Sequence, residues 1–501
     1  MRSPSLPGPI GICLALLLCS SFSQAKSDKT APISSETEEC LDCHGDATAG
    51  IVHDWLSSRH AQTTPATAMK KSKLQRRISV AKLPPKLANV AVGCFECHGL
   101  NPKKHKDNFL HEGHRINVVV SPADCKTCHP EEADQFAQSK KANAIANLTQ
   151  NPVYHQLVKT ATGAMTLTKK GLSQAAPTGA TQGQTCFACH GKKIEVVGTH
   201  KVSTDDGDFE FPTLTNWPNQ GIGRINPDGS RGACTACHPR HSFSIAIARK
   251  PETCGQCHLG PDVPAYVVYK ESKHGNIYAS KKADYNWDAV PWKVGKDFKA
   301  PTCATCHNAL VTTPDSSVIA KRTHDFGSRL WVRIFGLIYA HPQPAHGATY
   351  KLRNPDGLPM PTTFAGANAK KGLISTKEAD TRRSKMQKVC RGCHSSDWAK
   401  GHFRNLDKAV AETNKMTRVA TQLVERAWKN KVADPSNRFD EPIEKMWVEQ
   451  WLFYANSIRY AAAMGGPDYA TFKNGWWQLT KNLKRMHVWL KDSKRTARPA
   501  R

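Results

Sequence analysis

Residues 234–258 read CTACHPRHSFSIAIARKPETCGQCH, and this stretch contains the pattern Cys-x-x-Cys-His twice. In each copy the two thiols lie three positions apart, along one helical turn, and the next residue carries an imidazole. This spacing is typical of c-type haem attachment, in which the thiols form thioethers with the porphyrin and the histidine binds the iron as proximal ligand. Because the two copies start 20 residues apart, at Cys234 and Cys254, we predict two haems in van der Waals contact.

The same pattern recurs along the chain. Its sites are Cys40, Cys43 and His44; Cys94, Cys97 and His98; Cys125, Cys128 and His129; Cys186, Cys189 and His190; Cys234, Cys237 and His238; Cys254, Cys257 and His258; Cys303, Cys306 and His307; and Cys390, Cys393 and His394. One motif alone could equally belong to a zinc ribbon or a redox-active cysteine pair, but here every pair has an adjacent histidine. The chain has 18 cysteines, and the two outside these motifs are Cys13 and Cys19. The pattern predicts eight covalently bound c-type haems with iron and leaves no cysteine for a disulfide.

The first 25 residues have the features of a secretion signal. An apolar run over residues 10–18 precedes a small-residue segment, and we predict cleavage after Ala25. Cys19 follows Leu18 rather than the small residue of a lipoprotein signal, so we expect no lipid anchor. No later apolar run reaches the ~20 residues of a membrane span. We predict an exported, soluble protein of the periplasm or an equivalent extracytoplasmic compartment.

The composition fits an interior that is filled by cofactors as well as by side chains. Only 39% of the 501 residues are hydrophobic, which is modest for a chain that should bury a large core. The formal net charge is +28 at pH 7. We expect no nucleic-acid partner, because export removes nucleic acid from reach and haem propionates return negative charge. The remaining positive charge favours an acidic redox partner protein or an anionic substrate.

Fourteen of the 22 histidines lie outside the motifs. Any one of them fits a surface or core position equally well, but as a group they are better interpreted as distal ligands of the haem irons. The candidates, which lie in short polar segments near motifs, are His60, His114, His200, His241, His274, His324 and His402. A haem that lacked such a ligand would be open for chemistry.

Two regions of the chain differ in character. Residues 26–400 contain all the motifs and many glycines and prolines, and we predict an octahaem-binding domain of loops and short helices there. Residues 401–501 predict a C-terminal helical domain, with helices over residues 406–430, 443–464 and 469–493 and a weak point at Gly475. Tryptophans on these helices favour a subunit interface, used for trimerisation, as well as packing onto the haem domain. The predicted fold is mainly α.

The stretch over residues 223–276, from GRINPDGSRGACTACHPRH to CGQCHLGPDVPAYVVYKESKHGN, resembles the octahaem hydroxylamine oxidoreductase family, as does AAAMGGPDYATF over residues 461–472. The resemblance implies a multihaem cytochrome c with a close-packed octahaem array. It also implies a homotrimer, or a higher assembly of trimers, built around the C-terminal helices. The fourth haem would be catalytic, with an open distal face bordered by the residues after the sixth motif and by Tyr339-Ala340-His341-Pro342. We expect a redox partner protein, for which a small c-type cytochrome subunit is one candidate.

Two departures from the family members that oxidise hydroxylamine or hydrazine bear on the direction of the reaction. Those members have a histidine after Asp262, where this chain has Val263. They also bring a tyrosine from a neighbouring subunit to crosslink the catalytic porphyrin, where this chain has alanines at 461–463, and the registers of Tyr460 and Tyr469 do not match. The chain thus resembles the members without the crosslink. An undistorted haem donates electrons more readily, and the missing histidine removes a proton acceptor.

We therefore predict an oxidoreductase that acts on small inorganic nitrogen compounds and reduces nitrite to nitric oxide, hydroxylamine or ammonia at the fourth haem. Asp262, Tyr339 and His341 are the candidate catalytic residues, which would supply protons for cleavage of the N–O bond. Each of them could instead make only a structural hydrogen bond. Two alternative functions stay open: oxidation of hydroxylamine or hydrazine at the same haem, and non-enzymatic electron transfer with every haem sealed.

Overall fold

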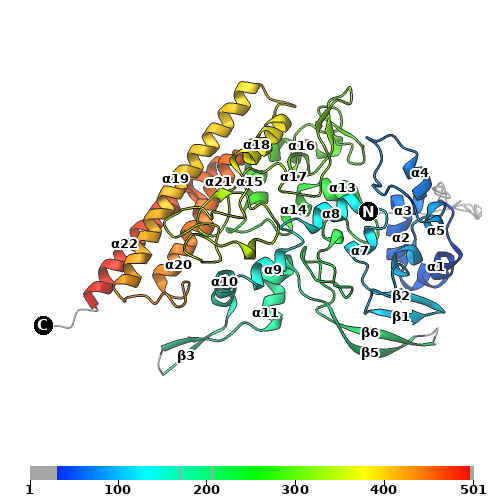
Figure 1. Cartoon of the computed structure of the whole chain (residues 1–501), viewed down its shortest axis with the longest axis horizontal. Helices are drawn as coiled ribbons and strands as arrows, with labels where there is room; N and C mark the ends of the chain where they lie inside the picture. The colour runs from blue at the N-terminus through cyan, green and yellow to red at the C-terminus, as the bar shows by residue number, and fades with distance from the viewer. Residues whose placement is uncertain (1–30, 170, 205–206, 497–501) are drawn as a thin grey trace, which may run out of the picture.

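The computed structural model describes residues 31–169, 171–204 and 207–496. The predicted signal peptide, residues 1–25, lies outside these residues. Figure 1 shows N-terminal helices and hairpins at one end, a middle region of short helices joined by loops, and long C-terminal helices along the opposite side. About 47% of the chain is helical and strands are few. The predicted mainly α fold is confirmed.

Short helices make up the motif region. They are α1 (Ser35–Ala47), α2 (Ala49–Ser57), α3 (Arg59–Gln62), α4 (Pro65–Met69), α5 (Pro85–Ala88), α6 (Cys94–His98), α7 (Pro122–Cys125), α8 (Pro130–Ala137), α9 (Ala144–Thr149), α10 (Pro152–Thr162), α11 (Gly179–Gln184), α12 (Cys186–His190), η1 (Cys234–Ala236), α13 (Ile245–Arg249), α14 (Pro251–Gly255), α15 (Ala265–Glu271), α16 (Lys273–Lys281), η2 (Lys282–Asp284), α17 (Cys303–His307) and η3 (Thr349–Lys351). Helices this short are marginal in isolation, so they depend on tertiary contacts and bound groups.

The strands form small sheets. They are β1 (Asn108–His111), β2 (His114–Asn117), β3 (Met165–Thr168), β4 (Gly171–Gln174), β5 (Glu195–Thr204), β6 (Gly207–Thr215), β7 (Trp292–Lys293), β8 (Val311–Thr312), β9 (Val318–Ala320), β10 (Val332–Arg333) and β11 (His341–Pro342). Antiparallel pairs join β1 to β2, β3 to β4, β5 to β6 and β10 to β11, while β8 lies between β7 and β9. The long β5–β6 hairpin lies beside β1–β2 (Figure 1).

The motifs lie on these helices or at their ends. Helices α6, α12 and α17 each consist of one motif, so a single turn carries both thiols and the histidine. The turns begin at defined caps: the Gly93 N–H donates to the Glu96 carboxylate at 3.0 Å, and the Thr302 N–H donates to the Thr305 hydroxyl at 3.0 Å. Such caps satisfy backbone groups at the start of a helix and fix the direction in which the thiols point.

The C-terminal region is helical, and α19 and α22 are its longest helices. These are α18 (Thr376–Cys390), α19 (Ser396–Lys429), α20 (Pro442–Val448), η4 (Glu449–Tyr454), α21 (Ala455–Met464), η5 (Tyr469–Lys473) and α22 (Trp476–Thr496). The three predicted helices are confirmed, although α19 begins ten residues before the predicted start, where the Ser395 hydroxyl accepts from the Trp398 N–H. The predicted weak point at Gly475 separates η5 from α22, and a Cβ there would lie 1.7 Å from the Ala470 carbonyl oxygen.

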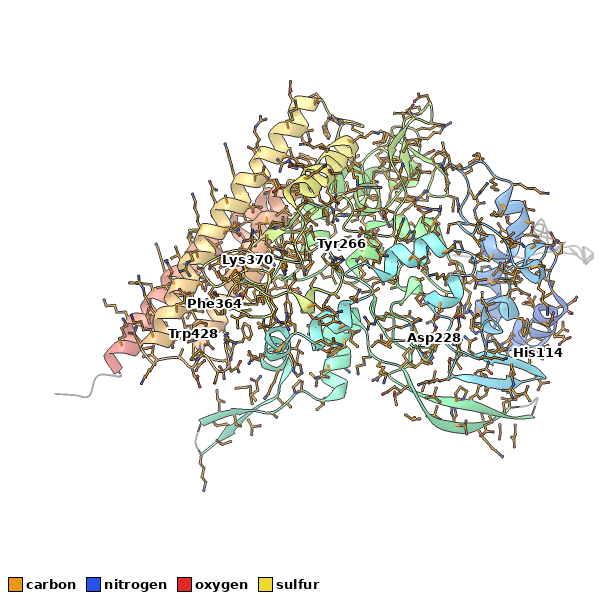
Figure 2. The ribbon with its side chains drawn as sticks, viewed as in Figure 1. His114, Asp228, Tyr266, Phe364, Lys370 and Trp428 are labelled. Carbon is orange, nitrogen blue, oxygen red and sulfur yellow. The ribbon has the colours of Figure 1, made fainter. Side chains whose placement is uncertain are left out.

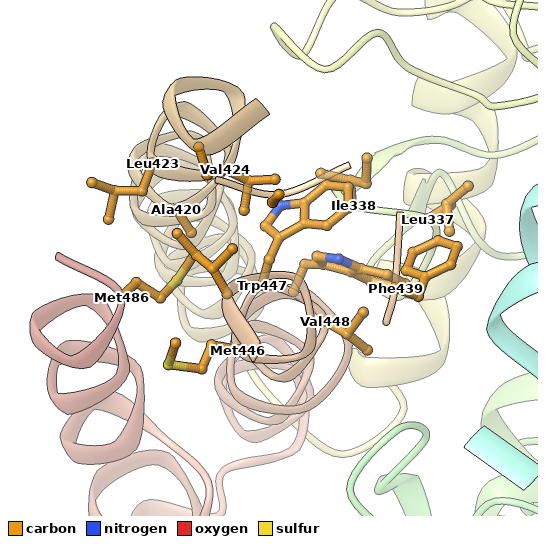
Figure 3. Close-up of a cluster of buried hydrophobic side chains, with 14 of the residues drawn as sticks. Leu337, Ile338, Ala420, Leu423, Val424, Phe439, Met446, Trp447, Val448 and Met486 are labelled. Carbon is orange, nitrogen blue, oxygen red and sulfur yellow. The ribbon is translucent and has the colours of Figure 1, made fainter. Parts of the chain in front are cut away.

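The largest apolar core lies among α19, α20, α22 and the loop around Leu337 (Figure 3). Trp447 and Trp451 are almost fully buried at its centre. Burying a large apolar side chain contributes roughly 1.5–3 kcal/mol, so this cluster fixes the C-terminal helices against the motif region. None of the helices in the described ranges is long and apolar enough to cross a membrane.

Candidate haem sites and reaction pocket

A large cavity runs through the motif region. Its volume is about 2240 Å³, whereas pockets for drug-sized ligands have volumes of about 300–1,000 Å³. Its walls carry thiols or imidazoles from the second motif to the eighth, from Cys97 to His394. Protein interiors are otherwise close-packed. The space therefore fits several large flat groups that are attached to these thiols.

Thiols of different motifs meet inside the fold, and all the motif cysteines are free of disulfides. The hydrogen-bonded pairs are Cys40 with Cys94, Cys125 with Cys234, Cys189 with Cys257, and Cys254 with Cys303. These contacts join the first motif to the second, the third to the fifth, the fourth to the sixth, and the sixth to the seventh. Cys97 also lies within electrostatic range of Cys125, Cys237 of Cys254, and Cys306 of Cys390. Groups bound at the eight motifs would therefore form one continuous array.

Four motif histidines face a second histidine from a distant part of the chain. The ring centres are 6.2 Å apart for His44 and His111, 6.4 Å for His129 and His60, 6.4 Å for His238 and His324, and 6.1 Å for His394 and His274. Two imidazoles that bind one metal from opposite sides, through metal–nitrogen bonds of about 2 Å, have ring centres roughly 6 Å apart. Each pair therefore fits the two axial ligands of a haem iron.

The second ring nitrogen of other motif histidines is held by the backbone. His98 Nδ1 lies 2.7 Å from the Asn117 carbonyl oxygen, and His190 Nδ1 lies 3.1 Å from that of Ala144. Donation from Nδ1–H to a carbonyl fixes the ring and leaves the Nε2 lone pair for a metal. This arrangement again fits proximal ligands of iron.

The predicted distal histidines fall into two groups. His60, His274 and His324 stand opposite motif histidines, as described above. His241 lies close to His98, and burial together with that neighbour lowers the pKa of His241 to about 4. A neutral imidazole is the form that binds a metal.

The other three predicted distal histidines form no ring pair with a motif histidine among the described residues. His114 Nε2 is 2.6 Å from a Glu39 carboxylate oxygen, at the N-terminal end of the molecule (Figure 2). His200 is exposed on β5. His402 Nε2 lies 3.1 Å from the Ala463 carbonyl oxygen. His114 and His200 therefore have protein oxygens near their rings, whereas His402 also lines the cavity within electrostatic range of the motif histidine His394.

Sequence reasoning missed His111. It lies at the end of β1, where it is the register partner of His114 on β2. Both histidines belong to the same HEGH segment, so their sequence contexts do not separate them. The hairpin decides which ring reaches His44.

Side chains from other elements lie near His190 of the fourth motif. Asp262 and Arg333 each lie within electrostatic range of both His190 and Tyr460. Gly191, directly after the motif, has a φ of +93° and lets the end of α12 pack against the backbone of Arg224, because a Cβ there would lie 2.3 Å from the Arg224 nitrogen. The fold thus brings together residues from α12, the loop after α14, β10 and α21.

Electrostatics in this pocket are shaped by burial. Burial raises the pKa of Asp262, and it also raises the pKa of Tyr460. The Asp262 backbone carbonyl accepts from the Asn456 amide at 3.0 Å, which fixes the loop against α21. The Arg333 Nε donates to the Phe335 carbonyl oxygen at 2.9 Å, and within the described residues Arg333 forms no salt bridge. Arg333 and Tyr460 were not among the predicted site residues.

Tyr339 and His341, two predicted site residues, lie behind this pocket. The Tyr339 hydroxyl donates to the Phe364 carbonyl oxygen at 2.7 Å, among the C-terminal helices (Figure 2). His341 Nδ1 lies 2.7 Å from the Pro342 carbonyl oxygen, and its Nε2 is buried without a partner. Burial and the nearby Arg333 lower the pKa of His341 to about 3. Neither side chain lines the cavity.

Comparison with protein families identifies two matching models. The model described as "Seven times multi-haem cytochrome CxxCH" matches residues 227–326. The model described as "Cytochrome c554 and c-prime" matches residues 39–118 and 124–207. Together they account for much of the motif region.

Solved structures extend the likeness to the whole fold. A "Hypothetical multiheme protein" is 45% identical, with a TM-score of 0.88, over 94% of this chain and 98% of the other. A second structure, the "Kuenenia stuttgartiensis reducing HAO-like protein complex Kustc0457/Kustc0458", is 20% identical with a TM-score of 0.61, over 92% of this chain and 86% of that one. The chain belongs to the multihaem cytochromes c. As a member of this family it binds c-type haem covalently, with iron, through its Cys-x-x-Cys-His motifs.

A curated relative of this cytochrome is much longer. The "Probable nitrite reductase-hydroxylamine oxidoreductase fusion protein" of Kuenenia stuttgartiensis is 24% identical over 424 residues. The match covers 79% of this chain but only 38% of that protein. The multihaem cytochrome described here therefore spans well under half the length of that relative.

Proposed function

We propose that this multihaem cytochrome is an octahaem oxidoreductase that reduces nitrite, to nitric oxide, hydroxylamine or ammonia, at the haem of the fourth motif. That haem supplies an iron that binds the substrate nitrogen, and the others supply electrons to it. The names of the relatives support chemistry on inorganic nitrogen compounds. The side chains around His190 favour reduction over oxidation as the direction of the reaction.

The main support for the proposal is the position of Arg333, a positively charged side chain beside the fourth motif. It lines the cavity within electrostatic range of His190, and no carboxylate of the described residues pairs with it. A guanidinium without an ionic partner in a partly dry pocket favours a small anion. Nitrite is an anion near neutral pH, whereas hydroxylamine and hydrazine are not, so Arg333 favours nitrite as the substrate.

Proton supply is the second requirement. Each N–O bond that breaks during reduction takes up protons and releases water, so the pocket needs groups that can donate them. Burial raises the pKa of Asp262, which favours the protonated form of its carboxyl. Tyr460 of α21 lines the cavity and lies within electrostatic range of Asp262. We assign proton donation to Asp262, with Tyr460 beside it, and a supporting role to His341 and Tyr339 through Arg333 and the core.

We also propose the haem number, the export and the assembly of the protein. It carries one haem at each of its eight motifs within residues 26–400, and it is exported by a signal peptide over residues 1–25. Residues 401–501 form a homotrimer interface. Trp477 and Val488 support this assignment, because both are exposed, at 59% and 54%, and lie on the same face of α22. A small c-type cytochrome is the proposed redox partner.

Turnover of the purified holoprotein tests the proposal. With a reduced viologen as electron donor, we expect nitrite-dependent oxidation of the dye and an optical spectrum without a crosslinked-haem band. With an electron acceptor and hydroxylamine, we expect much slower turnover. Fast hydroxylamine oxidation without nitrite reduction would overturn the proposed direction. A spectrum in which every haem is six-coordinate and nitrite does not bind would support an electron carrier instead.

A further inference from the structure

The two N-terminal helices carry a local excess of acidic side chains. Residues 31–58, which include α1 and α2, contain six aspartates and glutamates and no lysine or arginine. Across the whole chain, by contrast, 70 lysines and arginines outnumber 42 acidic residues. Both helices lie at the end of the molecule opposite α19 and α22 (Figure 1). The net charge of +28 therefore does not describe the surface at this end.

Three of these acids form a stripe along α1. Glu38, Asp42 and Asp46 follow one another at intervals of four residues, and all three are exposed. Side chains at this spacing lie on one face of a helix, where like charges repel each other. The helix dipole favours Glu38 in the first turn, but it disfavours Asp46 in the last turn. Helix stability thus does not account for this acidic stripe, which points to a role toward a partner.

Exposed apolar side chains accompany the acidic stripe on the next helix. Ile51 and Leu56 of α2 are exposed at 45% and 39%, and α2 packs against α1. Apolar side chains with charged side chains around them are the usual composition of a protein–protein interface. The acidic stripe and these two apolar residues therefore supply both components of a docking surface, which we call the α1–α2 surface.

The first motif lies on the same helix, at one end of the array of motifs. Its thiols and histidine do not line the large cavity, and it is joined to the second motif by the contact of Cys40 with Cys94. Cys43 directly follows Asp42 of the acidic stripe and is exposed. A haem attached here would lie between the α1–α2 surface and the rest of the array.

The other end of the array has the opposite charge. The eighth motif begins at Cys390, which is the last residue of α18. This helix carries two acidic and five basic residues, which are Glu378, Asp380, Lys377, Arg382, Arg383, Lys385 and Lys388. A partner with a positively charged face would be repelled there and attracted at the α1–α2 surface. The two ends therefore favour partners of opposite charge.

We propose that the α1–α2 surface is the docking site for a small electron carrier whose interacting face is positively charged. The carrier gives one electron to the array at the first motif and leaves oxidised, and no atom is transferred. Complementary charge speeds the association of such short-lived complexes, for which a small interface is enough. This inference rests on the haem array and the redox partner of the proposed function. It does not depend on nitrite as the substrate.

A photoexcited zinc cytochrome tests the docking without nitrite. The probe is a small basic cytochrome c in which zinc replaces iron, and its long-lived excited state is quenched when it donates one electron to a ferric haem. With ferric holoprotein we expect fast quenching that slows as the ionic strength rises from about 0.01 M to about 1 M, because the Debye length falls from about 30 Å to about 3 Å. The same probe with succinylated, negatively charged lysines should be quenched slowly. Equal quenching of the two probes would overturn the proposal.

A variant of α1 locates the surface. Glu38→Gln/Asp42→Asn/Asp46→Asn removes the charge of the acidic stripe. It should lower the quenching rate of the basic probe about tenfold at low ionic strength, because the electrostatic attraction is lost. Glu39 is kept in this variant, since its carboxylate lies 2.6 Å from His114 Nε2.

The matched control removes the same number of charges outside these two helices, in Asp284→Asn/Asp356→Asn/Glu412→Gln. All three of these acids are exposed, and the control should leave the quenching rate almost unchanged. An α1 variant that is quenched as fast as the control would overturn the proposal. So would a smaller assembly of the α1 variant in sedimentation, because the α1–α2 surface would then be a contact between copies of this chain.

Discussion

Replacing Arg333 by glutamine tests whether the pocket is built for an anion. A hydrogen bond from a charged group contributes about 1.5–3 kcal/mol, and each 1.4 kcal/mol corresponds to about a factor of ten. The KM for nitrite should therefore rise roughly 10- to 150-fold in Arg333→Gln. Hydroxylamine is uncharged near neutral pH, so the KM for hydroxylamine should change about threefold or less, as expected for a weak electrostatic interaction.

Three controls make this measurement decisive. Arg333→Lys keeps the charge and should recover much of the affinity for nitrite. Arg353→Gln removes an exposed arginine that donates only to nearby carbonyl oxygens, and it should leave KM unchanged. The haem spectrum must match that of the wild type, because Arg333 also holds the Phe335 carbonyl. Steady-state nitrite reduction with an equal KM in Arg333→Gln and Arg353→Gln would refute the reasoning.

Further predictions concern single groups. Asp262→Asn should lower kcat for nitrite about 10²–10⁴-fold, the range for loss of a proton donor, at unchanged haem content; an unchanged kcat would remove Asp262 from the mechanism. His111→Ala should convert one low-spin haem to high spin by electron paramagnetic resonance, whereas His114→Ala should not; the reverse result would reassign the ligand of the first haem. Burial opposes the charge of His105, but two buried aspartates outweigh it and raise its pKa to about 10. The ion pairs therefore stabilise the fold fully below about pH 6.5, and this contribution is lost as the pH rises through about 10. Between these two pH values, the free energy of unfolding measured in urea should fall less in His105→Gln than in the wild type. Identical pH profiles for the two proteins would contradict the assignment.

Much of this protein follows from its local sequence. Covalent haem attachment needs two thiols and an imidazole on one helical turn, so consecutive residues such as Cys303 to His307 contain the whole signal. The C-terminal helices are similarly local, because their apolar periodicity and their breaks at Pro442 and Gly475 depend on near neighbours. The expectation that Asp262 lies beside the fourth motif came from a family resemblance, and the structure places it in range of His190.

The sequence by itself determined the cofactor class, the attachment points and the helical character of the C-terminal region. The tertiary structure decided which histidine faces which motif, because the partners are far apart along the chain and both members of a segment such as HEGH look alike. It also revealed Arg333, which in the sequence only interrupts an apolar run. The position of Arg333 beside the fourth motif arises from convergence of distant segments on one cavity, and that convergence has no periodic or local pattern to predict it.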